Sequence, residues 1–206
     1  MIEYVREPKE IYRQSFAIAR AETDLSAIPP ALQDVVLRLV HACGMPDIVG
    51  ELAFSADVAA SVSAALADGA PVLVDTPMVA QGITAERVRG SGRIVCTYGE
   101  TAATAAERPS TRAAASVELW GSRLAGAVVA IGNAPTALFR LLELLDGGAP
   151  RPAAIVAFPV GFVGAAESKK ELARDSRGIP FLTLLGRRGG SALAAAAING
   201  FFEGLP

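Results

Sequence analysis

His41 is the single histidine of this chain, so the protein either performs no acid–base chemistry near neutral pH or concentrates that chemistry at this position. A helix is predicted from Pro29-Pro30 to Gly44, with His41 near its C-terminal end. At about 100° per residue, His41 lies nearly opposite the apolar stripe of this helix, and Arg38 shares its side. Two interpretations follow: an exposed histidine beside a surface arginine, or a proton donor/acceptor beside a cation that faces an anionic ligand. The apolar stripe consists of Leu32, Val35, Val36, Leu39, Val40 and Cys43.

Two further polar side chains have an unusual placement. Ser15 lies on the apolar face of a helix predicted over residues 8–23. Its hydroxyl could bond back to a carbonyl one turn earlier or be offered to a ligand. Arg112 follows Pro109-Ser110-Thr111, which is typical of a helix start. A cation there opposes the helix dipole, so Arg112 indicates either a bound anion or an ordinary solvated arginine.

Two glycine-rich turns could bind anions through their backbone. Gly132, Asn133 and Ala134 join an apolar run to a predicted helix, and we expect them to offer free N–H groups. Gly189, Gly190 and Ser191 do the same at the end of residues 186–191, a turn that also carries two arginines. Tight turns explain the glycines equally well, and neither segment matches a Walker loop or a dinucleotide fingerprint.

Short apolar runs alternate with helical stretches from residue 71 onward, after a third predicted helix at residues 55–68 with Ser55 as its N-cap. This alternation predicts an α/β fold: a single three-layer α/β/α domain over residues 1–206, with a mainly parallel sheet of about five strands and an N-terminal helical segment. In such sheets ligands bind beyond the carboxyl ends of the strands. The predicted strands are 71–75, 93–97, 127–131, 153–157 and 180–185, and the predicted helices between or after them are 113–124, 135–145, 165–174 and 191–202.

Composition excludes several classes of protein. The net charge of −2 gives no electrostatic basis for binding nucleic acid or an anionic membrane surface. No stretch of 18 apolar residues lacks breakers or charges, and the polar first residues predict no signal peptide. Cys43 and Cys96 are isolated, which indicates neither a disulfide framework nor a zinc site. We therefore expect a cytoplasmic protein without a metal site.

Seven segments resemble the precorrin-8X methylmutases of cobalamin (vitamin B12) biosynthesis, and together they span nearly the whole chain. They are SFAIARAE (15–22), RLVHACG (38–44), DTPMVAQGI (75–83), STRAAA (110–115), VAIGNAPTALF (129–139), PVGFVGAAESK (159–169) and GRRGGS (186–191). The stretch between Glu100 and Ser110 departs from the family, because it is short and rich in alanine.

The resemblance implies a cofactor-free, homodimeric isomerase that acts on a tetrapyrrole bearing several carboxylates. A methyl group would move from ring carbon 11 to ring carbon 12 of precorrin-8X and give hydrogenobyrinate. The catalytic histidine of the family falls on His41, and its substrate-contacting serine and arginine fall on Ser15 and Arg38. Arg112 matches a family arginine that we expect to face the substrate. His41 would then donate a proton to the ring system, and the arginines and helix N-termini would hold the carboxylates.

Three alternatives stay open from the sequence. The substrate could carry cobalt, as in the cobalt-precorrin-8 methylmutases of the anaerobic route. The protein could instead be a tetrapyrrole carrier without catalysis. The glycine-rich turns also suggest a nucleotide- or phosphate-binding α/β enzyme, although no phosphate-loop signature supports it.

Overall fold

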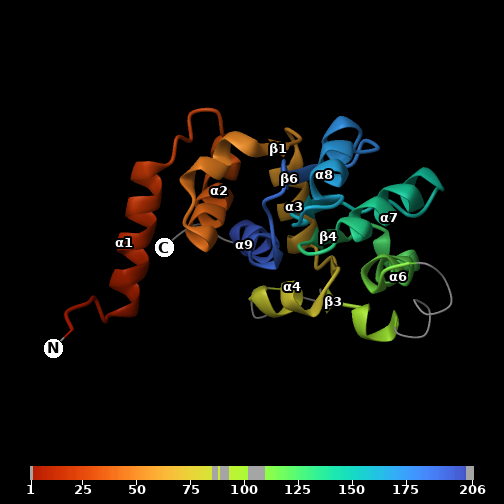
Figure 1. Ribbon diagram of the computed structural model, residues 1–206, viewed down its shortest axis with the longest axis horizontal. Coiled ribbons are helices and arrows are strands. Elements are labelled where there is room, and N and C mark those ends of the chain that lie inside the picture. The colour runs from red at the N-terminus through yellow and green to blue at the C-terminus, as the bar shows by residue number, and fades with distance from the viewer. Residues whose placement is uncertain (1, 85–87, 89–92, 102–109, 203–206) are drawn as a thin grey trace.

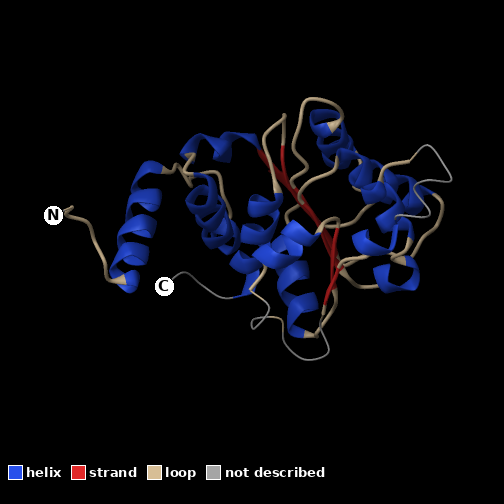
Figure 2. Ribbon diagram, turned by 60° about the horizontal axis from the view of Figure 1, so that its bottom comes forward, coloured by secondary structure: helices blue, strands red, loops and turns tan. Residues whose placement is uncertain are grey.

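The computed structural model describes residues 2–84, 88, 93–101 and 110–202, arranged as helices on both sides of a central sheet (Figures 1 and 2). Most of the alanine-rich stretch between Glu100 and Ser110 lies outside the described residues.

The sheet confirms the predicted α/β class and its mainly parallel character. Within the described residues it has six strands in the order β1-β6-β5-β4-β2-β3, and every neighbouring pair is parallel except β1 with β6. This agrees with the predicted sheet of about five strands, and the strand that was not foreseen is β1, a half-buried segment of three residues that has no strand periodicity. The strands are β1 (Leu52–Phe54), β2 (Val72–Val74), β3 (Ile94–Val95), β4 (Val128–Ile131), β5 (Ala154–Ala157) and β6 (Phe181–Leu184).

Two apolar clusters fill the spaces on either side of the sheet, which confirms the three layers. Val128 and Ala130 of β4 face one cluster, and Val129 and Ile131 face the other, as the alternation of side chains along a strand requires. One side is covered by α3 (Val58–Ala67), α4 (Pro77–Gly82) and α9 (Ser191–Phe202), and the other by α6 (Arg112–Glu118), α7 (Pro135–Asp146) and α8 (Ala165–Arg174). None of the helices in the described part of the chain is both long and apolar enough to cross a bilayer.

The predicted N-terminal helices lie outside α9, one beyond the other (Figure 1). They are α1 (Pro8–Glu22) and α2 (Pro30–Cys43), and a 3-10 helix, η1 (Pro46–Glu51), follows them. A side chain at Gly200 of α9 would come within 2.9 Å of the Val35 backbone, so this glycine allows α2 and α9 to pack closely. On α1, only Phe16 and Ala19 are fully buried.

Two predicted details of the helices are wrong. Ser55 does not cap α3, which begins after Asp57; its hydroxyl instead accepts the N–H of Phe181 at 3.0 Å and ties β1 to β6. The helix expected over residues 113–124 ends at Glu118 and resumes as a 3-10 turn at Gly121, whose φ of 52° interrupts a right-handed helix.

The antiparallel strand β1 determines where α2 ends relative to the sheet. Leu52, the first residue of β1, pairs with Leu184, the last residue of β6. The segment before β1 therefore approaches the carboxyl edge of the parallel strands, the edge where ligands bind in such folds. Through η1, the last turn of α2 with His41 is brought toward that edge.

Candidate functional site

The imidazole of His41 is held by side chains from α1. Its Nδ1 lies 2.8 Å from the hydroxyl oxygen of Ser15, across the contact between α1 and α2. The ring stacks on Phe16, with centroids 4.7 Å apart, and is tilted against Tyr12 at 5.4 Å. His41 is half-buried, and no partner of its Nε2 is found among the described residues. Both roles considered for Ser15 from the sequence missed this partner, which lies on another helix.

Arg38 accompanies His41, as the helical spacing predicted. Its guanidinium carbon lies 5.8 Å from the centroid of the Phe16 ring, so the same aromatic side chain contacts both. The buried Nε of Arg38 has no hydrogen-bond partner in the described part of the chain. Burial lowers the pKa of His41 below its ordinary 6.5, and the charge of Arg38 lowers it further. The surface around His41 and Arg38, the His41 face, therefore combines an imidazole whose charged form is disfavoured with a cationic donor that has no partner in the described residues.

The turn at residues 186–191 lies against the segment that follows His41. The guanidinium of Arg188 donates to Asp47 at 2.6 Å and pairs with Glu51 at 2.9 Å, and it also contacts the sulfur of Met45 at 3.9 Å. The buried ammonium of Lys169 donates to the carbonyl of Arg188, and burial lowers the pKa of Lys169 to about 8.

Close packing explains Gly189 of this turn, whereas Gly186 and Gly190 have φ angles of 77° and 129°, which residues with side chains rarely adopt. A side chain at Gly189 would lie 2.3 Å from the carbonyl oxygen of Phe158, and the N–H of Gly190 donates to the same oxygen at 2.8 Å. Ser191 then begins α9 at the carboxyl edge. Contact of Gly189, Gly190 and Ser191 with a ligand stays a prediction.

In the second glycine turn, a side chain of the protein itself accepts the hydrogen bonds that a bound anion would accept. The carboxylate of Asp75, fully buried after β2, accepts the N–H groups of Gly132, Asn133 and Ala134 at 3.0, 2.9 and 2.9 Å. The prediction that these N–H groups are free is wrong, because the protein itself occupies the cradle. Burial raises the pKa of Asp75, and the three hydrogen bonds oppose that rise. The sequence signal for Asp75 was its place directly after β2, the neighbour of β4, whose end leads into the glycine turn.

In its own chain, Arg112 is held by protein contacts. Thr111 caps α6, and the Arg112 guanidinium donates to the carbonyl of Tyr98 at 3.1 Å and lies 4.4 Å from the centroid of its ring. Tyr98 follows β3, at the opposite edge of the sheet from β1. Five strand spacings of about 4.8 Å put these two edges about 24 Å apart. Within one chain, Arg112 and His41 are therefore not brought together, and α6 and α1 lie at opposite ends of the molecule (Figure 1).

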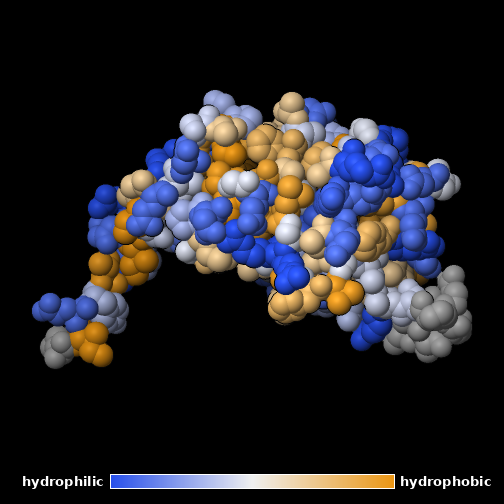
Figure 3. Space-filling model, turned by 45° about the horizontal axis from the view of Figure 1, so that its top comes forward, coloured by the Kyte–Doolittle hydropathy of each residue, from blue (hydrophilic) through white to orange (hydrophobic). Residues whose placement is uncertain are grey.

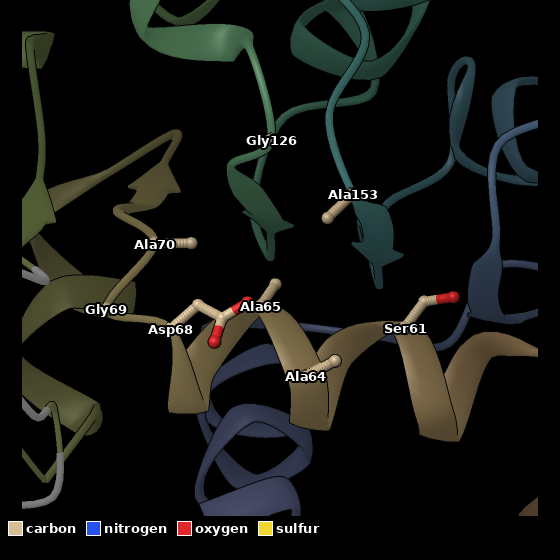
Figure 4. A pocket seen from close by; sticks show the side chains of 8 residues that line it. All are labelled: Ser61, Ala64, Ala65, Asp68, Gly69, Ala70, Gly126 and Ala153. Atoms are coloured by element: carbon tan, nitrogen blue, oxygen red, sulfur yellow. The ribbon is translucent and has the colours of Figure 1, made fainter.

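Two surface hollows of about 470 Å³ each lie among the described residues, and neither is lined by His41. One opens beside Tyr12 on α1 and is lined by Pro8, Lys9, Tyr12 and Arg13. The other lies between α3 and the amino ends of the strands, where small side chains surround Asp68 (Figure 4). Among the described residues, no three His, Cys, Asp or Glu side chains gather as metal ligands would.

Comparisons with known proteins agree with this arrangement. A family model described as precorrin-8X methylmutase matches residues 10–203. The chain is 55% identical over 201 residues to a precorrin-8X methylmutase from Pseudomonas aeruginosa, with 97% of each chain covered. It is 32% identical to a cobalt-precorrin-8 methylmutase from Priestia megaterium, over 94% of this chain and 86% of the relative.

A solved structure of precorrin-8X methylmutase from Thermus thermophilus superimposes with a TM-score of 0.84 at 34% identity, covering 94% of both chains. The fold and the sequence thus point to one family along almost the full length of the chain. The chain belongs to the precorrin-8X methylmutases, the isomerases of cobalamin biosynthesis.

Proposed function

We propose that this protein converts precorrin-8X into hydrogenobyrinate by moving a methyl group from ring carbon 11 to ring carbon 12, with His41 as the proton donor/acceptor. The observation that carries the proposal is the pairing of Ser15 with His41 at 2.8 Å beside Arg38. Ser15 engages Nδ1 and fixes the plane of the ring, which leaves Nε2 for the substrate.

The reaction breaks one carbon–carbon bond and forms another within the same molecule. Protonation of a ring nitrogen or an adjacent carbon by His41 draws electrons through the conjugated system and assists the migration. Substrate and product are isomers, so the proton lent by His41 is balanced by one returned when the product forms. Fixing the macrocycle against the imidazole supplies the rest of the rate enhancement.

Electrostatics at the site suits a polycarboxylate. The buried Nε of Arg38 lacks a partner in the described residues, and a substrate carboxylate would satisfy it. That negative charge also raises the pKa of His41 again, opposing burial and Arg38. Substrate binding would therefore load His41 with the proton that it donates.

A second copy of the chain completes the assembly in this proposal. Ile11 and Ile18 lie on one side of α1 and are 46% and 56% exposed. Figure 3 shows apolar side chains on this projecting part of the molecule. A homodimer would cover them and would let Arg112 act at the partner's site, although it lies far from His41 in its own chain. A mass of twice 21.2 kDa in light scattering is expected. A cytoplasmic location stays a prediction from the sequence.

The metal-free substrate is favoured over the cobalt form by the degree of similarity. The Pseudomonas relative named for precorrin-8X is 55% identical, whereas the relative named for cobalt-precorrin-8 is 32% identical. Purified protein incubated with precorrin-8X should produce the visible spectrum of hydrogenobyrinate, and incubation with the cobalt form should change the spectrum far more slowly. Bound precorrin-8X with an unchanged spectrum would indicate a carrier instead.

A further inference from the structure

Two large apolar side chains project from the loop between β5 and α8. Phe162 and Val163 are 85% and 88% exposed, the highest values among the large hydrophobic residues that the structure describes. Gly161 and Gly164 flank them with φ angles of 140° and 80°, which residues with side chains rarely adopt. The backbone therefore presents this pair, which we call the apolar tip, to the surface rather than to the core.

The apolar tip stands at the same edge of the sheet as His41. Its loop is tied to both glycine turns, because the N–H of Val160 donates to the carbonyl of Asn133 at 3.4 Å and the N–H of Gly161 donates to the carbonyl of Arg187 at 3.2 Å. The next residue, Arg188, contacts Met45, which is four residues after His41. A flat ligand on this edge could thus reach the tip and the imidazole together.

The two adjacent arginines of the turn differ in whether a carboxylate pairs with their charge. Arg188 is held by the carboxylates of Asp47 and Glu51. Arg187 has no carboxylate partner in the described part of the chain, and its guanidinium carbon lies 5.5 Å from the centroid of the Phe162 ring. A cation stacked on an aromatic ring keeps its outer N–H groups free for an anion.

We infer that Phe162, Val163 and Arg187 form a further part of the substrate site. The inference rests on the proposed function. The apolar tip would cover one face of the macrocycle, and Arg187 would bind a carboxylate at its rim. A tetrapyrrole fits because it combines an extended ring face with peripheral carboxylates, which matches an aromatic side chain beside an unpaired guanidinium.

The test is equilibrium binding of hydrogenobyrinate, followed by its visible absorbance after ultrafiltration. Phe162→Ser and Arg187→Ala should each raise the Kd about tenfold. Added salt should shrink the effect of Arg187→Ala but not that of Phe162→Ser, because only the first removes a charge. In turnover of precorrin-8X both variants should raise KM with little change in kcat, since these contacts are also made in the ground state.

Control variants distinguish loss of a ligand contact from a general effect of the substitutions on the protein. Arg93→Ala removes an exposed arginine at the amino edge, before β3, and should leave the Kd unchanged. Phe162→Tyr keeps the ring and should keep the affinity. Unchanged Kd values for Phe162→Ser and Arg187→Ala would overturn the inference, and so would a change of oligomeric mass in Phe162→Ser, since the tip would then contact protein.

The wild-type protein distinguishes the two claims. Conversion of precorrin-8X by wild type with unaltered binding in the variants would remove only the role of the tip. Binding of hydrogenobyrinate by wild type without conversion of precorrin-8X would remove the proposed function. The Kd values of the variants would still decide whether the tip touches the ligand.

Discussion

The sequence suggested an anion site both at the Gly132 turn and on the face around His41, but the two regions differ in whether the protein satisfies their hydrogen-bond donors. At the turn, Asp75 satisfies three backbone N–H groups from within the protein. On the His41 face, the buried Nε of Arg38 has no partner in the described residues. A cluster of donors thus indicates a ligand site only where the chain has not supplied the acceptor itself.

The largest expected effect lies on the His41 face. His41→Ala should lower kcat by about 10²–10⁴-fold, because the proton transfer is lost, and should change the Kd for hydrogenobyrinate only slightly. Stopped-flow absorbance with precorrin-8X measures the first quantity and ultrafiltration the second. His41→Gln retains polar atoms toward Ser15 but cannot transfer a proton, so it should be equally slow. Turnover by the glutamine variant at the native rate would contradict the proposed role.

Asp75→Ala should chiefly reduce stability. Removing the carboxylate leaves three N–H groups without their acceptor, one of them buried and two partly buried. We expect a loss of about 3 kcal/mol in the free energy of unfolding, measured by urea denaturation. Asp75→Asn keeps the shape of the side chain and should lose about half as much. Asp68→Ala, at an exposed position on the amino edge, should be neutral. Wild-type stability of Asp75→Ala would show that these three hydrogen bonds do not stabilise the fold.

A smaller effect is expected from removing the hydrogen bond that orients the imidazole of His41. Ser15→Ala removes the hydrogen bond to Nδ1, so kcat should fall about tenfold while the helix itself is not weakened, since alanine favours helices. Ser15→Thr retains a hydroxyl and should recover much of the rate. If the alanine variant turned over normally, the aromatic contacts of Phe16 and Tyr12 alone would hold the ring.

The smallest effect is a displacement of the pH profile. The pKa of His41 is lowered in the free protein, so kcat/KM should fall as pH rises through a value below 6.5. Bound carboxylates raise the pKa again, so kcat should begin to fall at a higher pH. Arg38→Met removes a cation beside the ring, so kcat/KM should fall at a higher pH than in the wild type. If kcat/KM falls at the same pH in both proteins, His41 is not the titrating group.

Local signals made much of the fold predictable. Pro30 at the start of α2 and Gly44, with φ of 68°, at its end set the limits of that helix as expected. Fully apolar runs identified the buried parallel strands. β1 was missed because Leu52–Phe54 forms a strand only by pairing with β6, which follows it by more than 120 residues.

The grouping of Arg38 with His41 was predictable from the sequence, but the contacts between different helices and strands were not. Spacing along one helix placed Arg38 with His41. No local pattern could join Ser15 to His41, because the two residues are 26 positions apart on different helices. Likewise Asp75 reaches the Gly132 turn only because β2 and β4 are neighbours in the sheet. Contacts between elements depend on topology, which periodicity does not contain.

The helix that carries Ser15 is the outermost one in the molecule, and it rests on α2 (Figure 1). The hydroxyl that contacts the His41 ring therefore belongs to a helix with only two buried residues, Phe16 and Ala19. If a second copy of the chain packs against this helix, dilution into separate protomers would abolish turnover while the central sheet stays folded. Loss of catalysis at low concentration would then precede any loss of structure.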